Sequence, residues 1–115
     1  MQVYLDVTEG GTLTLRPYPG NLLRLGSSGD DVLYEQILLN RIRPVFVTIP
    51  PLEEDGIFGP RMRGAVTTFQ NLFGLAEDGI VGERTWNAMN RVYGAIASGC
   101  LKDGTLRTGR ILQFG

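Results

Sequence analysis

The sequence contains no histidine and a single cysteine, Cys100, and both absences restrict the chemistry it can perform. Without histidine, the chain lacks the usual general base of hydrolases, the Ser-His and Cys-His nucleophile pairs and the commonest zinc ligand. One cysteine can form neither an intramolecular disulfide nor a cysteine-rich metal site. We therefore predict no catalytic residues, no metal site and no cofactor in this chain.

Basic clusters and long apolar runs are also missing. Lys and Arg occur singly and the formal net charge is −1, so nucleic acid is not an expected partner. No apolar run approaches the roughly 20 residues that span a bilayer, and residues 1–10 lack the order of a secretory signal. We expect no membrane segment, and we expect any export signal to lie outside this chain.

The pattern along the chain divides it into three parts. In residues 1–20, Val3, Leu5 and Val7 alternate with polar residues, which predicts a small N-terminal β-hairpin, followed by a proline-containing linker at 17–20. Residues 21–97 are expected to form one helical domain. Residues 98–115 are expected to be a C-terminal tail, either loose or containing a strand that pairs with the hairpin.

Helical periodicity after residue 22 predicts three helices. The first should span residues 30–42, where two acids favour the positive end of a helix. The second should begin at Pro60, a favourable first-turn residue, and continue to residue 73, and the third should span 83–93 or slightly more. The spacing places the following residues in the core: Val32, Leu33, Ile37, Leu39, Ile42, Met62, Ala65, Val66, Phe69, Leu72, Phe73, Trp86, Met89, Tyr93 and Ile96.

An internal repeat is the most informative feature. Asp55-Gly56-Ile57-Phe58-Gly59 precedes the second expected helix, and Asp78-Gly79-Ile80-Val81-Gly82 precedes the third, with the two aspartates 23 positions apart. We expect the Asp to close an Asx-turn and the first Gly to adopt a positive φ. The apolar residue should fill the core, and the second Gly should let the helix start close to its neighbour.

The sequence resembles the peptidoglycan-binding domain family, small three-helix modules attached to many bacterial cell-wall hydrolases. The resemblance runs from about residue 22 to residue 93. The residues that carry it are Leu25-Gly26-Ser27-Ser28-Gly29, Val32, Gln36, Leu39-Asn40, both Asp-Gly-Ile segments, Ala65-Val66, Phe69-Gln70, Gly74-Leu75 and Thr85-Trp86. Tyr18-Pro19-Gly20 resembles the lead-in of modules from spore-forming Gram-positive bacteria and their phages.

Two positions depart from the family pattern. Met62 stands where the family usually has Thr, which the second copy keeps as Thr85, and Glu35 replaces an apolar residue before Gln36. If the missing hydroxyl helps to hold ligand in related modules, this copy binds weakly or recognises a different wall chemistry.

The resemblance implies an all-α three-helix fold, with the small N-terminal hairpin beside it. It also implies non-catalytic binding of peptidoglycan, through its glycan strand and stem peptide, by a monomer that anchors a tethered hydrolase or wall protein. The expected location is extracellular or cell-wall associated, with spore or phage association. The alternative is a protein-interaction module of a spore-coat or phage-structure component. Catalysis by the acidic loop at 53–55 is a weaker alternative, because adjacent acids in such a loop are more often solvated.

We place the candidate groove between the second and third helices, bordered by both Asp-Gly-Ile loops. Arg61 and Arg84 occupy equivalent repeat positions, and arginine can bind a stem-peptide carboxylate through two parallel hydrogen bonds. The alternative is an exposed arginine on a solvated face. The candidate ligand-binding residues are Asp55, Phe58, Arg61, Gln70, Asp78, Arg84, Trp86 and Tyr93.

Structural alternatives exist for most of these candidates. Turn formation alone explains both aspartates. Trp86 could stack on a sugar face, but its place on an apolar stripe favours burial, as for Phe58. The hydroxyl of Tyr93 favours a position at the solvent-exposed edge of the core. Gln36 and Gln70 could bind stem-peptide amides or tie loop carbonyls between the helices.

Overall fold

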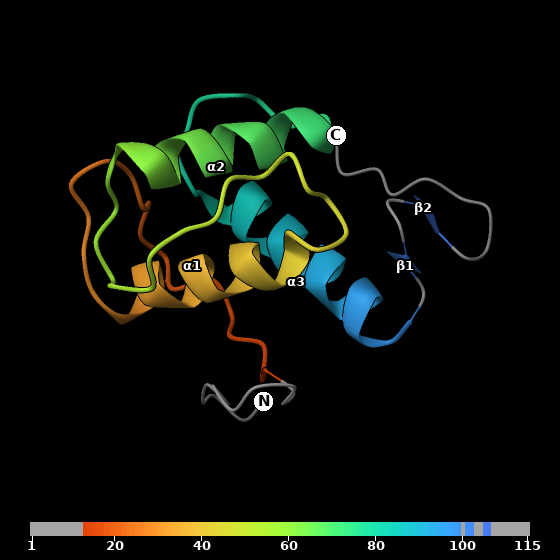
Figure 1. Ribbon diagram of the computed structural model, residues 1–115. Helices are drawn as coiled ribbons and strands as arrows, with labels where there is room; N and C mark the ends of the chain where they lie inside the picture. The colour runs from red at the N-terminus through yellow and green to blue at the C-terminus, as the bar shows by residue number, and fades with distance from the viewer. Residues whose placement is uncertain (1–12, 100, 103–104, 107–115) are drawn as a thin grey trace.

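The computed structural model describes residues 13–99, 101–102 and 105–106. Helices α1 (Asp30–Ile42), α2 (Pro60–Leu72) and α3 (Glu83–Ala97) are followed by the short strands β1 (Leu101–Lys102) and β2 (Thr105–Leu106). Figure 1 shows α2 above α1 with α3 crossing behind them, and α3 packs against α1. The predicted three-helix fold is confirmed: α1 has the predicted bounds, α2 ends one residue early, and α3 continues to Ala97.

The core is formed by the apolar faces of the three helices and by one residue from each Asp-Gly-Ile loop. Phe58 and Val81 are 1% and 0% exposed, as predicted for the residues that fill the core. Leu72 was predicted to be buried, and this was wrong, because its side chain is 40% exposed. It lies at the edge of the apolar stripe in the last turn of α2, whereas Phe69 and Phe73 pack together with their ring centroids 4.7 Å apart.

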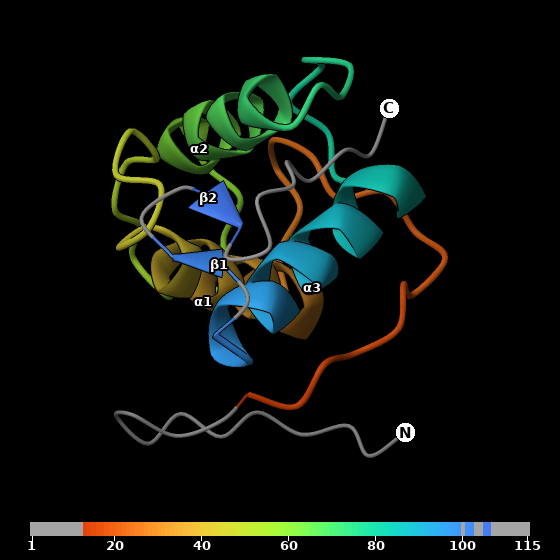
Figure 2. The same cartoon turned by 90° about the vertical axis from the view of Figure 1, so that its right-hand side faces the viewer.

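The segment before the helices packs along α1 and α3 (Figure 2). The carbonyl of Arg16 accepts hydrogen bonds from Trp86 Nε1 and Asn90 Nδ2, both at 2.9 Å, and the Arg16 N–H donates to the Tyr34 hydroxyl at 3.0 Å. Leu13 is 2% exposed. Residues 13–20 form no strand, and the rest of the predicted hairpin, residues 1–12, lies outside the described residues. The packed unit therefore begins before residue 21.

The next stretch of chain joins both repeat loops. Leu23 exchanges two backbone hydrogen bonds with Val81, at 3.0 and 2.8 Å, and Ser28 forms an isolated bridge with Ile57. One short segment, residues 23–28, which turns at Gly26, thus bonds to both loops. In the tail, β1 pairs with β2 in antiparallel register, so the described tail strands pair with one another.

Candidate functional site

Both repeat loops adopt the turn that the sequence predicts. Asp55 Oδ1 accepts the backbone N–H of Ile57 at 3.0 Å, and Asp78 Oδ1 accepts that of Ile80 at 3.0 Å. These are Asx-turns, in which a side-chain oxygen closes the turn that a backbone carbonyl would otherwise close. The first glycine of each loop has a positive φ, 73° at residue 56 and 70° at residue 79. The predicted roles of the aspartate and first glycine are confirmed.

The second glycine of the repeat has the predicted role in one copy only. A Cβ added to Gly82 would lie 3.2 Å from Leu22 Cδ2, so the start of α3 approaches its neighbour closely. A Cβ added to Gly59 would meet nothing within 4 Å, and the prediction of close approach was wrong there.

Gln36, on α1, holds the first loop. It is 1% exposed, its Oε1 accepts the N–H of Gly56 at 2.8 Å, and its Nε2 donates to Asp55 Oδ1 at 3.1 Å and to the Ile57 carbonyl at 2.9 Å. A buried amide with all its groups paired fixes the loop to the helix. The bonds from Ile57 and Gln36 also lower the pKa of Asp55 below its ordinary value of 3.8, because they favour the carboxylate.

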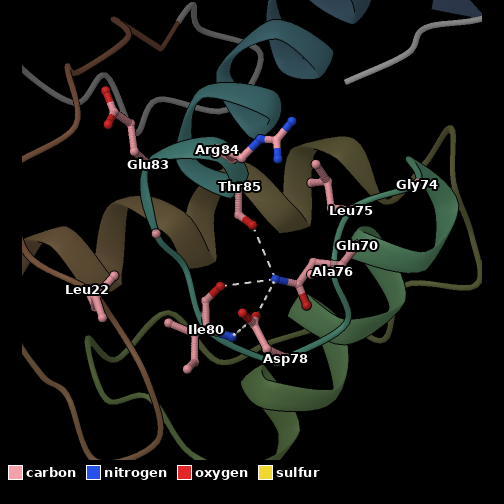
Figure 3. A pocket seen from close by; sticks show the side chains of 11 residues that line it. Leu22, Gln70, Gly74, Leu75, Ala76, Asp78, Ile80, Glu83, Arg84 and Thr85 are labelled. Atoms are coloured by element: carbon pink, nitrogen blue, oxygen red, sulfur yellow. Dashed lines mark hydrogen bonds between the residues drawn. The ribbon is translucent and has the colours of Figure 1, made fainter. Parts of the chain in front are cut away.

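Gln70, on α2, holds the second loop in the same way (Figure 3). Its Oε1 accepts the N–H of Gly79 at 3.0 Å, and its Nε2 lies 2.9 Å from Asp78 Oδ1 and 3.0 Å from the Ile80 carbonyl. A further contact joins Nε2 to Thr85 Oγ1 at 3.2 Å. The expectation that the two glutamines tie loop carbonyls to the helices is confirmed.

The second loop forms one wall of a hollow of about 340 Å³, which we call the second hollow. The end of α2 and the first turn of α3 complete it, with Arg84 and Glu83 at the rim and Leu22 opposite Leu75 (Figure 3). Its lining combines apolar side chains with carboxylates, an amide, a hydroxyl and a guanidinium. The residues that line it are Leu22, Gln70, Gly74, Leu75, Ala76, Asp78, Ile80, Gly82, Glu83, Arg84 and Thr85.

The first loop lines a smaller hollow of about 160 Å³, which we call the first hollow. It is built from the equivalent positions of the repeat, since Gln36 corresponds to Gln70, Arg61 to Arg84 and Met62 to Thr85. Its lining residues are Gln36, Leu52, Glu53, Asp55, Ile57, Gly59, Pro60, Arg61 and Met62. The structure therefore contains two related hollows where the sequence predicts one groove bordered by both loops.

The candidate residues fall into three groups. Asp55 and Arg61 line the first hollow, whereas Gln70, Asp78 and Arg84 line the second. The remaining three candidates are buried and offer little or no surface to a ligand: Phe58 is 1% exposed, Trp86 0% and Tyr93 6%. The indole of Trp86 stacks on Tyr34 at 5.1 Å between ring centroids and bonds to the N-terminal segment.

Several lining residues were not among the candidates. Leu22, Leu75 and Ile80 form the apolar part of the second hollow, and Glu83 and Thr85 add polar atoms. Alignment of the two repeat copies could have marked Thr85, because Met62 occupies the equivalent position in the first copy. No local signal marked Leu22, because it reaches the hollow from a segment far away in the sequence.

The part of the chain that the structure describes contains neither a cluster suited to a metal ion nor a helix suited to crossing a membrane. No three side chains of His, Cys, Asp or Glu come together there in an arrangement that could hold a metal ion. The helices formed by these residues include none with the length and apolar character needed to cross a bilayer.

Comparisons with known proteins agree on one family. The family model for the peptidoglycan binding domain matches residues 28–89. The zinc D-Ala-D-Ala carboxypeptidase of Streptomyces albus G is 45% identical over 62 residues, which are 54% of this chain and 23% of that protein. The chain thus spans about a quarter of the length of this curated relative.

Solved structures give the same result. The N-terminal domain of SleB matches with a TM-score of 0.55 and 28% identity, covering 66% of this chain and 97% of that one. A fused zinc-dependent amidase/peptidase/peptidoglycan-binding domain-containing protein from Clostridium acetobutylicum matches with a TM-score of 0.55 and 37% identity. That match covers 62% of this chain and 29% of the other.

Proposed function

Because the chain belongs to the peptidoglycan-binding domain family, we propose that it attaches to the bacterial cell wall by binding the stem peptide of peptidoglycan in the second hollow. The observation that carries this proposal is the hollow itself, a space of about 340 Å³ lined mainly by matched residues, whose loop is held in place by the buried Gln70. Sites for small ligands are commonly concave and mostly apolar, with a few fixed polar groups.

The lining favours a peptide over a sugar ring. Sugar faces are commonly recognised by an aromatic ring that offers broad apolar contact. None of the residues that line the second hollow is aromatic, and Trp86 lies behind it with no exposed surface. The methyl groups and backbone of a short peptide match Leu22, Leu75 and Ile80 better than a pyranose ring would.

Charge at the rim also suits a stem peptide. Arg84 can donate two parallel hydrogen bonds to a carboxylate, and Glu83 and Asp78 provide carboxylates for an amine. Stem peptides carry carboxylates, amides and, at their diamino acid, an amine. A ligand with both charge signs therefore finds partners on both sides of the hollow.

Attachment of this kind needs no chemistry from the chain itself. A module that keeps a partner domain near an insoluble substrate raises its local concentration, even when the module binds weakly. We propose that the chain is non-catalytic, that it acts at the cell wall, and that its attached partner is a wall hydrolase or another wall protein. Family relatives include a carboxypeptidase and an amidase/peptidase fusion, which supports this role.

Sedimentation with purified sacculi tests the proposal. The folded chain should co-sediment saturably with intact sacculi while the turbidity of the suspension stays constant, and a heat-unfolded sample should not. A soluble stem peptide should compete the chain off intact sacculi, whereas soluble glycan strands freed of stem peptides by an amidase should not. Competition by the glycan strands and not by the peptide would show that the glycan is the ligand. No retention on intact sacculi would favour a protein partner, and falling turbidity would reveal an activity.

A further inference from the structure

The two repeat-related hollows differ in ways that bear on which one can accept a ligand. The first is less than half the volume of the second, about 160 against 340 Å³, although the two are lined by corresponding residues. We propose that only the second hollow is a ligand site, and that Met62 and Arg61 close the first. This inference rests on the proposed function for its ligand and adds which copy binds it.

Met62 is the first element of the closure. It is 2% exposed and lines the first hollow at the position where the second hollow has Thr85. The longer thioether side chain fills space that a threonine leaves open. It also lacks the hydroxyl that, at Thr85 Oγ1, lies 3.2 Å from Gln70 Nε2. The first hollow therefore has less room and one polar group fewer on its floor.

Arg61 is the second element. Its Nε donates to the carbonyl of Pro51 at 2.7 Å, which ties the side chain to the loop that borders the first hollow. The Arg84 side chain makes no hydrogen bond or ion pair with the residues that the structure describes, so its guanidinium keeps its donors for a ligand. Of two arginines at equivalent positions, one is engaged with its own chain and one is available.

The position before the arginine differs too. The second hollow has Glu83 at its rim, whereas the first has Pro60, which supplies no charge. The first hollow is also lined by carboxylates, those of Glu53 and Asp55, but its arginine is already bonded to Pro51. An unengaged arginine beside a carboxylate, Arg84 with Glu83, therefore occurs at the second hollow, which is also the larger of the two.

A nuclear magnetic resonance titration with a synthetic stem tetrapeptide distinguishes the two hollows residue by residue. In the wild-type chain, backbone amides between residues 74 and 85 should shift saturably, and those between 52 and 62 should not. Shifts of similar size in both regions, or shifts confined to the first, would overturn the inference. No shift anywhere would overturn it together with the proposed function.

Reciprocal substitutions test the closure directly. Met62→Thr should enlarge the first hollow, so that residues 52–62 also shift, although at higher peptide concentrations than residues 74–85 because Arg61 remains bonded to Pro51. Thr85→Met should close the second hollow and weaken binding at least 10-fold. A folded Met62→Thr variant whose first loop stays silent while its second loop responds would contradict the inference and leave the proposed function intact. If Met62→Thr does not fold, Thr85→Met and the wild-type shift map decide.

Discussion

The two copies of the repeat have the same loop architecture and different surroundings. Each loop is closed by an aspartate and held by a buried glutamine, and the bond lengths agree within a few tenths of an ångström. Around that shared frame, the second copy has an open hollow with an unengaged arginine, and the first has a methionine and a tethered arginine. The comparison shows that the repeat encodes the frame, whereas residues that differ between the copies set the volume and polarity of the hollow beside each loop.

The largest expected effect comes from removing the glutamine that holds a loop. Gln70→Ala leaves the buried N–H of Gly79 without its acceptor and should lower the free energy of unfolding by about 3 kcal/mol, since an orphaned buried group costs about 1–3 kcal/mol. Gln36→Ala should lower the free energy of unfolding by about 2 kcal/mol, a smaller loss, because Gln36 has no contact that corresponds to the one between Gln70 and Thr85. Urea unfolding measures both losses.

Asn87, exposed on α3, provides the control for this pair. Asn87→Ala should change stability by less than about 0.5 kcal/mol, as is usual for surface positions. A loss below 1 kcal/mol in the Gln70→Ala variant would show that the glutamine does not hold the loop as the hydrogen bonds indicate.

A second difference between the copies lies one residue before each glutamine, where the first has Glu35 and the second has Phe69. Both side chains are 0% exposed, but neither carboxylate oxygen of Glu35 has a hydrogen-bond partner. Burial raises the pKa of Glu35 well above its ordinary value of 4.5, and the nearby charge of Asp31 adds to the shift. The fold therefore favours the protonated acid.

This raised pKa predicts how stability changes with pH. The folded chain holds the proton of Glu35 more tightly than the unfolded chain does, so the stabilisation is complete below pH 4.5 and is lost as pH rises through the folded-state pKa. Wild-type stability should fall as the pH is raised from 4.5 towards neutrality. Glu35→Leu should flatten this dependence and add about 2 kcal/mol at pH 7, because an unpaired buried polar group is costly.

Glu35→Gln is the matched variant for this test. It should remove the pH dependence without the full gain in stability, because the amide is also buried among apolar groups. Asp55 acts in the opposite sense, since its pKa is lowered and its contribution is lost only as pH falls below about 3.8. Melting temperatures measured between pH 4.5 and 8 separate the two groups, and a flat wild-type profile would contradict the assignment.

The smallest effect concerns the N-terminal segment, which covers the second copy. Trp86 in the second copy corresponds to the exposed Arg63 in the first, and its Nε1 bonds to the Arg16 carbonyl. Trp86→Phe keeps an aromatic ring in the core but removes the indole N–H. Loss of its hydrogen bond should lower the free energy of unfolding by about 1 kcal/mol, in addition to any loss of packing. Hydrogen exchange at the Arg16 amide should accelerate.

Tyr93→Phe sharpens this test. It removes the hydroxyl that accepts the Leu13 N–H at 3.2 Å, so exchange should accelerate at Leu13 while Arg16 changes less. Unchanged exchange at Arg16 in the Trp86→Phe variant would show that the segment is held mainly by its apolar contacts.

Local features of the sequence predicted most of the fold. Helical periodicity placed α1 at its observed bounds, and the Asp-Gly-Ile repeat predicted both Asx-turns and both positive-φ glycines. The exposure of Leu72 was missed because periodicity cannot tell how far a neighbouring element extends. The packing of Leu13 and Arg16 on α3 was missed because it joins residues 70 or more positions apart.

The site was less predictable than the fold, for a physical reason. Asp78 and Arg84 were among the candidates because of their positions in the repeat, and Gln70 because its amide can pair with an amide of a stem peptide. The bond from Arg61 to Pro51 could not be predicted, since that contact depends on how the loop before Arg61 turns. Local sequence patterns also could not separate one groove into two hollows, because Leu22 and Leu75 come to line the same hollow only in the folded chain.

Retention on sacculi by the two single arginine variants tests the central claim most directly. Arg84→Ala and Arg61→Ala remove the same charge from equivalent positions, and both residues are exposed, so folding should be preserved in each. The account predicts that Arg84→Ala loses at least 10-fold in affinity for sacculi, whereas Arg61→Ala changes it less than 2-fold. Equal retention by both variants and the wild type, or a larger loss for Arg61→Ala, would contradict it.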